Sequence, residues 1–219
     1  MSNESFLKVS RPFGPPLGKV SIPDTLIKNI NDFVDNEIVN NNNRSKELDA
    51  GSDLVGQVTQ EINMPKEILD NGLHNFLEQT TIGYIKLSIN KDVTKFKLLN
   101  SWVVRQFETE YNPLHFHSGH ISGAGYLMIP ESLGSTVQDQ KKVNTHGNIN
   151  FHHGSKHFMS SGYVSNKPKV GDFYIFPHYL YHSVNPFFGK GERRSLSFNA
   201  KVNEEIFQVY GDHVYSEKK

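Results

Sequence analysis

The residues best suited to chemistry are three histidines. His115 and His117 stand one residue apart in the run Asn-Pro-Leu-His-Phe-His-Ser-Gly, and His182 follows the apolar run Phe173–Phe176. Side chains at positions i and i+2 of a strand point to one face, with bases about 7 Å apart, so two imidazoles there can approach one ion. A third ligand must come from another strand, and His182 is placed to supply it. Such a partial ligand set leaves coordination positions open, which favours a non-haem Fe(II) site.

A regular alternation of polar and apolar residues predicts a strand within Gly191–Val202. One face carries Arg193, Ser195, Ser197 and Asn199, and the other carries Leu196, Phe198, Ala200 and Val202. An arginine that points into a polar cavity offers a planar fork to a carboxylate, and such a charge-assisted pair is strong. The alternation therefore predicts an anion clamp at Arg193, with the Ser195 hydroxyl beside it, and places Arg194 on the opposite face.

The order His-x-His, then His, then Arg-x-Ser resembles that of the 2-oxoglutarate and Fe(II)-dependent dioxygenases. Two stretches, Asn112–Pro130 and Gly171–Asn199, resemble more narrowly an oxygenase family of bacteriophage genomes that is related to prolyl 4-hydroxylases. The resemblance extends from about Asn100 to Val202. It implies Fe(II), 2-oxoglutarate as cosubstrate, O2, and hydroxylation of an unactivated C–H bond. A prolyl or other peptidyl residue is the implied substrate, and a free amino acid or small metabolite is the alternative.

The resemblance also implies roles for individual residues. His115 and His182 would be metal ligands, while Arg193 and Ser195 would hold the distal carboxylate of 2-oxoglutarate. His117 stands where most members of the superfamily carry Asp or Glu, and we predict it as the third ligand. The alternative is that His117 supports the site from outside and an acidic residue completes the shell. Three neutral imidazoles would leave the iron its full 2+ charge, whereas a carboxylate would lower it.

Two alternatives fit parts of the pattern. A cupin-like dioxygenase with a three-histidine iron would need no 2-oxoglutarate; it explains His117 but gives Arg193 and Ser195 no role. A non-catalytic jelly-roll binding module would use the histidines for a structural metal or for hydrogen bonds alone. Open coordination positions argue against a structural ion, which protein ligands normally enclose.

The 219 residues suit one domain, 1–219, with helical support over about 20–90 and a core over about 96–203. Helical spacing begins at Ser21 and again near Pro65, and the polar stretch 39–64 reads as a loop. Short strands follow the helices; they are predicted at Phe96–Phe107, Ile121–Ile129, Asn148–His152, Gly171–Phe176 and Arg193–Val202. This order predicts a mainly β fold with supporting helices, a double-stranded β-helix or jelly roll. Two polar segments, 131–145 and 154–169, are predicted lids, and His152 and His153 could line the cavity mouth.

Charge and composition exclude several classes of partner. Lysine plus arginine and aspartate plus glutamate both total 23, so no net field recruits nucleic acid or an anionic membrane. The absence of cysteine excludes disulfides and thiolate metal sites. The segment Met1–Lys8 lacks the apolar core of a signal peptide, and we expect a cytoplasmic protein without a membrane partner. Nothing in the sequence specifies the oligomeric state.

Overall fold

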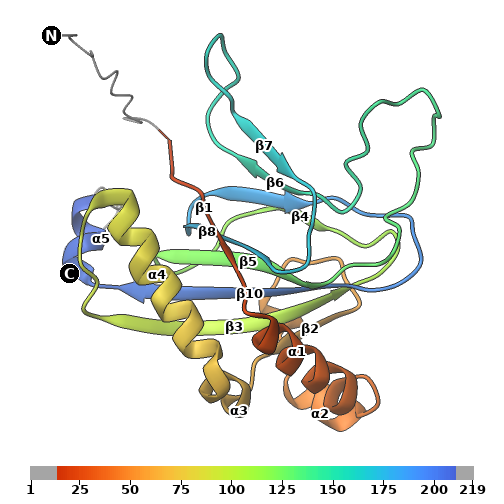
Figure 1. The fold of residues 1–219 in the computed structure, drawn as a ribbon, viewed down its shortest axis with the longest axis horizontal. Coiled ribbons are helices and arrows are strands. Elements are labelled where there is room, and N and C mark those ends of the chain that lie inside the picture. The colour runs from red at the N-terminus through yellow and green to blue at the C-terminus, as the bar shows by residue number, and fades with distance from the viewer. Residues whose placement is uncertain (1–13, 211–219) are drawn as a thin grey trace, which may run out of the picture.

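The computed structural model describes residues 14–210, so the expectation for Met1–Lys8 lies outside the described residues. Two antiparallel sheets pack against each other (Figure 1). The large sheet has the strand order β1-β8-β5-β10-β3-β2, and the small sheet has the order β4-β9-β6-β7. The strands are β1 (Gly18–Ser21), β2 (Gln60–Asn63), β3 (Phe96–Gln106), β4 (Asn112–His115), β5 (Ile121–Met128), β6 (Ile149–His152), β7 (Tyr163–Asn166), β8 (Asp172–Pro177), β9 (Tyr181–Val184) and β10 (Arg193–Val202).

Helices cover the outer face of the large sheet, where α4 crosses the strands (Figure 1). The helical segments are α1 (Asp24–Phe33), η1 (Val34–Ile38), α2 (Asn42–Glu47), η2 (Gly51–Asp53), α3 (Lys66–Ile68), η3 (Leu69–Leu73), α4 (His74–Ile89) and α5 (Glu204–Tyr210). The second predicted helix is interrupted at Gly72, whose φ of 99° lies in the left-handed region that glycine adopts without a steric penalty. No helix within residues 14–210 is long and apolar enough to span a bilayer.

Strand β10 separates two environments. Its apolar residues Leu196, Phe198 and Ala200 are fully buried against the helices, in the main hydrophobic core. Its polar residues face the space between the two sheets, where a second cluster including Phe151 and Phe176 forms the apolar floor. Successive strand residues point to opposite faces, so the alternation in the sequence becomes a division between core and cavity. The prediction of a mainly β fold with supporting helices is confirmed.

Two local predictions were wrong. The stretch 39–64 is not a simple loop, because it contains α2, η2 and the edge strand β2. Ser21 does not start a helix but ends β1, and α1 begins at Asp24. The predicted lid 154–169 contains the strand β7, and its role as a lid stays a prediction. Strands β2 and β7, which the sequence did not predict, have four residues each; β2 pairs with the distant strand β3, and β7 pairs with β6. Four residues give little alternation for a local pattern to reveal.

Candidate metal and anion site

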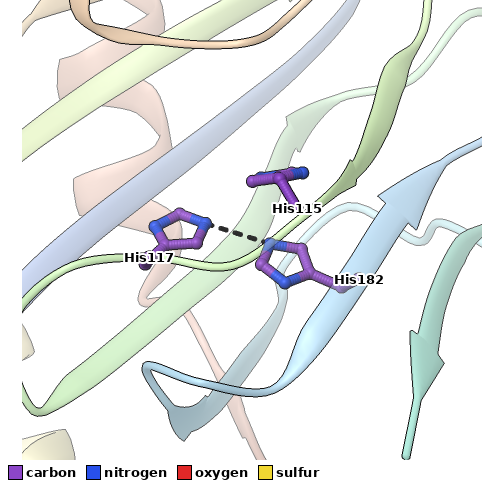
Figure 2. A group of neighbouring side chains, drawn as sticks. All are labelled: His115, His117 and His182. Carbon is purple, nitrogen blue, oxygen red and sulfur yellow. Dashed lines mark hydrogen bonds between the residues drawn. The ribbon is translucent and has the colours of Figure 1, made fainter. Parts of the chain in front are cut away.

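The three histidines come together at one point between the two sheets (Figure 2). His115 on β4 lies opposite His182 on β9 in the ladder of the small sheet. His117 lies two residues beyond His115, after β4 has ended, and its backbone N–H donates to the carbonyl oxygen of His178 at 2.9 Å. The spacing had predicted that His115 and His117 occupy one regular strand. This prediction was wrong, because β4 ends at His115. A backbone hydrogen bond after the strand end keeps the second imidazole beside the first.

Ligand-capable nitrogens of the three rings lie within 4.8 Å of one another. The Nε2 atoms of His117 and His182 are 3.0 Å apart. Of the described residues, these three histidines alone form a group of side chains that could hold a metal ion. Glu108 and Glu110, the nearest acidic residues in sequence, are not part of it. The Glu110 carboxylate instead accepts hydrogen bonds from the backbone N–H groups of Thr59 and Phe107.

Each ring directs its other nitrogen, Nδ1, at an oxygen. His115 Nδ1 lies 2.7 Å from the carbonyl oxygen of Pro113, and His182 Nδ1 lies 2.9 Å from that of Leu180. His117 Nδ1 lies 2.8 Å from Asn199 Oδ1. A carbonyl oxygen only accepts, so Nδ1 carries the proton in neutral His115 and His182, and the same holds for His117 with Asn199 as acceptor. In each neutral ring, Nε2 is then left with a lone pair.

Burial keeps the three imidazoles neutral. Desolvation, with a smaller contribution from the nearby His115, lowers the pKa of His117 to about 4. Desolvation also takes the pKa of His182 well below its ordinary value and lowers that of His115. Neutral imidazole is the form that binds a metal. The group is therefore in its ligating state at neutral pH.

Arg193 enters the same cavity from β10. It is 1% exposed, and its Nη1 donates to Gln106 Oε1 at 2.7 Å. The guanidinium lies 4.7 Å from the centre of the Tyr126 ring. Arg193 Nε and the Tyr126 hydroxyl are both buried without a hydrogen-bond partner, and no carboxylate among the described residues pairs with Arg193. A buried cation without a counter-charge is costly, so this arrangement favours an anionic ligand.

The cavity between the sheets has a volume of about 400 Å³. Its lining includes the predicted residues His115, His117, His182, Arg193 and Ser195. It also includes residues that the sequence did not single out as site residues; these are Glu61, Asn112, Tyr126, Ser197 and Asn199, together with the segment 53–56. A larger cavity of about 1460 Å³ lies on the helical side of the large sheet and contains none of the three histidines.

Some candidate residues lie elsewhere. Neither His152 nor His153 lines the cavity, and the His152 ring packs edge-on against Tyr163 at 5.1 Å. Trp102 also lines the cavity and stacks on His117 with ring centres 5.6 Å apart. Asn199 could have been found from the sequence, because it shares the polar face of β10 with Arg193 and Ser195. No pattern in the sequence around Glu61 indicated that it would line the cavity.

Comparison with known proteins finds a family match within the β core. Residues 100–199 match the family described as "Putative 2OG-Fe(II) oxygenase". These bounds agree with the resemblance seen in the sequence from about Asn100 to Val202. No curated protein matches the sequence.

Several solved structures share the fold at low sequence identity. A prolyl-4-hydroxylase from Pseudomonas putida has 14% identity and a TM-score of 0.53, over 84% of this chain and 91% of that chain. HygX from Streptomyces hygroscopicus, solved with nickel and 2-oxoglutarate, has 9% identity and a TM-score of 0.54, over 84% and 82%. The viral collagen prolyl hydroxylase vCPH from Paramecium Bursaria Chlorella virus-1 has 15% identity and a TM-score of 0.51, over 90% and 97%. The predicted jelly-roll fold is confirmed.

Proposed function

We propose that this chain, whose residues 100–199 match a family of 2OG-Fe(II) oxygenases, is a 2-oxoglutarate and Fe(II)-dependent oxygenase that hydroxylates an unactivated C–H bond with His115, His117 and His182 as iron ligands. The observation that carries the proposal is the hydrogen bonding of the three imidazoles. Two lone pairs that face each other at 3.0 Å, as in His117 and His182, repel unless a cation lies near them. Three convergent neutral imidazoles fit a divalent transition metal.

Hydrogen bonds from the Nδ1 atoms of the three histidines orient the rings. An imidazole ligand typically donates its second N–H to a carbonyl or carboxylate, which fixes the tautomer and the plane of the ring. Pro113, Leu180 and Asn199 provide such acceptors here. The Asn199 oxygen also accepts from the Ser122 hydroxyl at 2.8 Å, which fixes the amide itself. This support favours His117 as a ligand over a merely structural role.

Arg193 is the proposed partner of the distal carboxylate of 2-oxoglutarate. Its Nε and the Tyr126 hydroxyl have no hydrogen-bond partner among residues 14–210, so both can donate to a bound carboxylate. Ser195 lies opposite Tyr126 across the ladder between β10 and β5, with a hydroxyl on the same face. Three neutral ligands leave the metal its full 2+ charge, so the metal and Arg193 together attract a dianionic cosubstrate.

When bound, iron with 2-oxoglutarate and O2 supplies the oxidising chemistry, and the protein residues bind, orient and exclude water. Phe176 packs edge-on against the His182 ring at 4.8 Å, and Phe151 lies 6.0 Å from it. These apolar walls limit water at the buried side of the histidine group. The open side of the cavity is left for the prime substrate.

A turnover experiment tests the proposal against both alternatives. Purified protein is incubated with Fe(II), ascorbate and 2-oxoglutarate, and succinate is measured. The proposal predicts succinate formation that depends on iron and is lost in His182→Ala. Iron binding without consumption of 2-oxoglutarate would instead favour a cupin-like oxygenase, and the absence of iron binding would favour a binding module.

For the substrate, we propose a peptidyl residue, prolyl in the first instance. Two of the structures with similar folds are named as prolyl hydroxylases, which supports this choice by analogy of fold alone. Proline-rich peptides should raise succinate formation above the rate without prime substrate, with hydroxylated peptide detected by mass spectrometry. Succinate formation that no such peptide raises would favour a small-molecule substrate.

A further inference from the structure

Glu61 is a buried carboxyl group on the cavity side of the large sheet. It lies on β2 opposite Val104 of β3, which faces Ser195 of β10 in turn. Glu61 is 5% exposed and lines the cavity, whereas its neighbour Ile62 is fully buried on the helical side. Because neighbouring strands are about 4.8 Å apart, Glu61 lies two strands and roughly 10 Å from Ser195 along the same row. It therefore stands at the far wall of the cavity from the proposed anion clamp.

The Glu61 carboxyl group has no partner within the described residues. None of the hydrogen bonds or ion pairs among residues 14–210 involves its side chain, although its backbone carbonyl pairs with Ala50. The guanidinium of Arg105, one residue beyond Val104, is already held by Gln60 and Glu192. Burial, with a smaller contribution from the charge of Asp49, raises the pKa of the Glu61 carboxyl to about 7. A glutamate in a largely buried position without a cationic partner is uncommon without a functional reason.

A second unpaired acceptor points at the same space. Asn112 Oδ1 is buried without a hydrogen-bond partner. A Cβ atom added to Gly56 would lie 2.5 Å from Asn112 Oδ1 and 2.6 Å from Glu61 Oε1. The two oxygens thus converge on the same point beside Gly56, where a side chain would clash with both. Two convergent acceptors, one of them a carboxyl, complement a group that donates several hydrogen bonds and carries positive charge.

We propose that Glu61 and Asn112 are specificity-determining residues that receive a cationic nitrogen group, an ammonium or guanidinium, of the prime substrate. Their role toward a prime substrate rests on the proposed function, whereas cation binding itself does not. The cavity therefore has a cationic wall at Arg193, which attracts the anionic cosubstrate, and an acidic wall at Glu61, which repels it. A basic peptide side chain or a small amine fits the Glu61 wall.

The single tryptophan of the chain, Trp102, lines the same cavity and reports on binding there. The test follows the indole N–H cross-peak of the metal-free full-length protein at pH 8 during titration with n-propylammonium and n-propylguanidinium. Butanol and butyrate are the neutral and anionic probes. We expect at least one cation to bind about 10-fold more tightly to the wild type than to Glu61→Gln, the usual effect of a charged hydrogen bond. Butanol and butyrate should bind Glu61→Gln at least as well as the wild type.

The matched control is Asp53→Asn, because Asp53 also lines the cavity but is exposed to solvent. It should change the affinity for the cations less than about 2-fold, as exposed charges contribute little. Removing an unpaired buried charge should not unfold the protein, and a thermal midpoint of Glu61→Gln at or above the wild-type value checks this. Equal cation affinity in wild type and Glu61→Gln, or no cation binding at all, would overturn the inference.

Failure of the proposed function has a different signature. Iron content and succinate formation are measured separately in the wild-type protein. If these fail while Glu61-dependent cation binding holds, the pocket binds cations but the oxygenase proposal is wrong. If iron and succinate are found but the cations bind independently of Glu61, only the specificity role is lost.

Discussion

Arg193 and Arg194 are consecutive residues of β10, each 1% exposed, and their guanidinium groups lie on opposite faces of the large sheet. Arg194 donates to Glu192 and Asp35 on the helical side, both at 2.7 Å. Arg193 has Gln106 as its hydrogen-bond acceptor and faces the cavity. One arginine is therefore neutralised within the fold, and the other retains a charge that a ligand can use.

This relationship predicts different losses for the two substitutions. Arg193→Ala should weaken 2-oxoglutarate binding by roughly 30-fold to 1000-fold, because a charged pair in a cavity contributes on the order of 2 to 4 kcal/mol. Arg194→Ala should leave that affinity unchanged but lower the free energy of unfolding by roughly 3 kcal/mol, since it strips Glu192 of a buried partner. Titration of 2-oxoglutarate into anaerobic iron-loaded protein and chemical denaturation measure the two effects. A similar loss of cosubstrate affinity in both variants would contradict the assignment.

His115→Ala and His182→Ala should each abolish stoichiometric iron binding and turnover while the protein remains folded. Each substitution removes one of three convergent lone pairs. Elemental analysis after anaerobic loading with Fe(II) measures the metal, and far-UV circular dichroism checks the fold. Near-stoichiometric iron in His182→Ala would refute its role as a ligand.

His117→Ala and His117→Asp separate a ligand from a supporting residue. If His117 binds iron, the alanine variant should lose the metal, whereas the aspartate variant should retain it by supplying an anionic oxygen ligand. If His117 only supports another ligand, the alanine variant should keep iron with about 10-fold to 100-fold weaker affinity. Metal titration under anaerobic conditions distinguishes the two.

The absorption spectrum gives a second measure of the same question. Exchange of a neutral ligand for an anionic one should shift the charge-transfer band of the complex with Fe(II) and 2-oxoglutarate. An unchanged band in iron-loaded His117→Asp would argue against direct ligation.

The lowered histidine pKa values predict how the stability of the metal-free protein depends on pH. The unfolded chain binds a proton at His117 near pH 6.5, whereas the folded protein does so only near pH 4. Between these values the unfolded state holds more protons, so stability should fall as the pH is lowered from 6.5 toward 4. For His117 alone the loss is on the order of 3 kcal/mol. Denaturation of metal-free wild type across this range measures it, and His117→Phe should show a smaller pH dependence.

Much of the candidate site followed from local sequence patterns. The alternation in β10 placed Arg193 and Ser195 on one face and Arg194 on the other, because the two-residue period of a strand fixes side-chain direction. His117 did not follow the rule, because β4 ends at His115 and a backbone hydrogen bond to His178 places the next histidine.

The sequence by itself determined which residues could bind a metal and an anion, and which face of β10 they share. Tertiary structure alone decided that His117 and His182 meet at 3.0 Å, that Asn199 accepts from His117, and that Glu61 lies unpaired in the same cavity. The physical reason is the range of each interaction. Side-chain direction along a strand depends on neighbours in the chain, whereas burial, hydrogen-bond partners and the convergence of lone pairs depend on strands brought together from distant parts of the sequence.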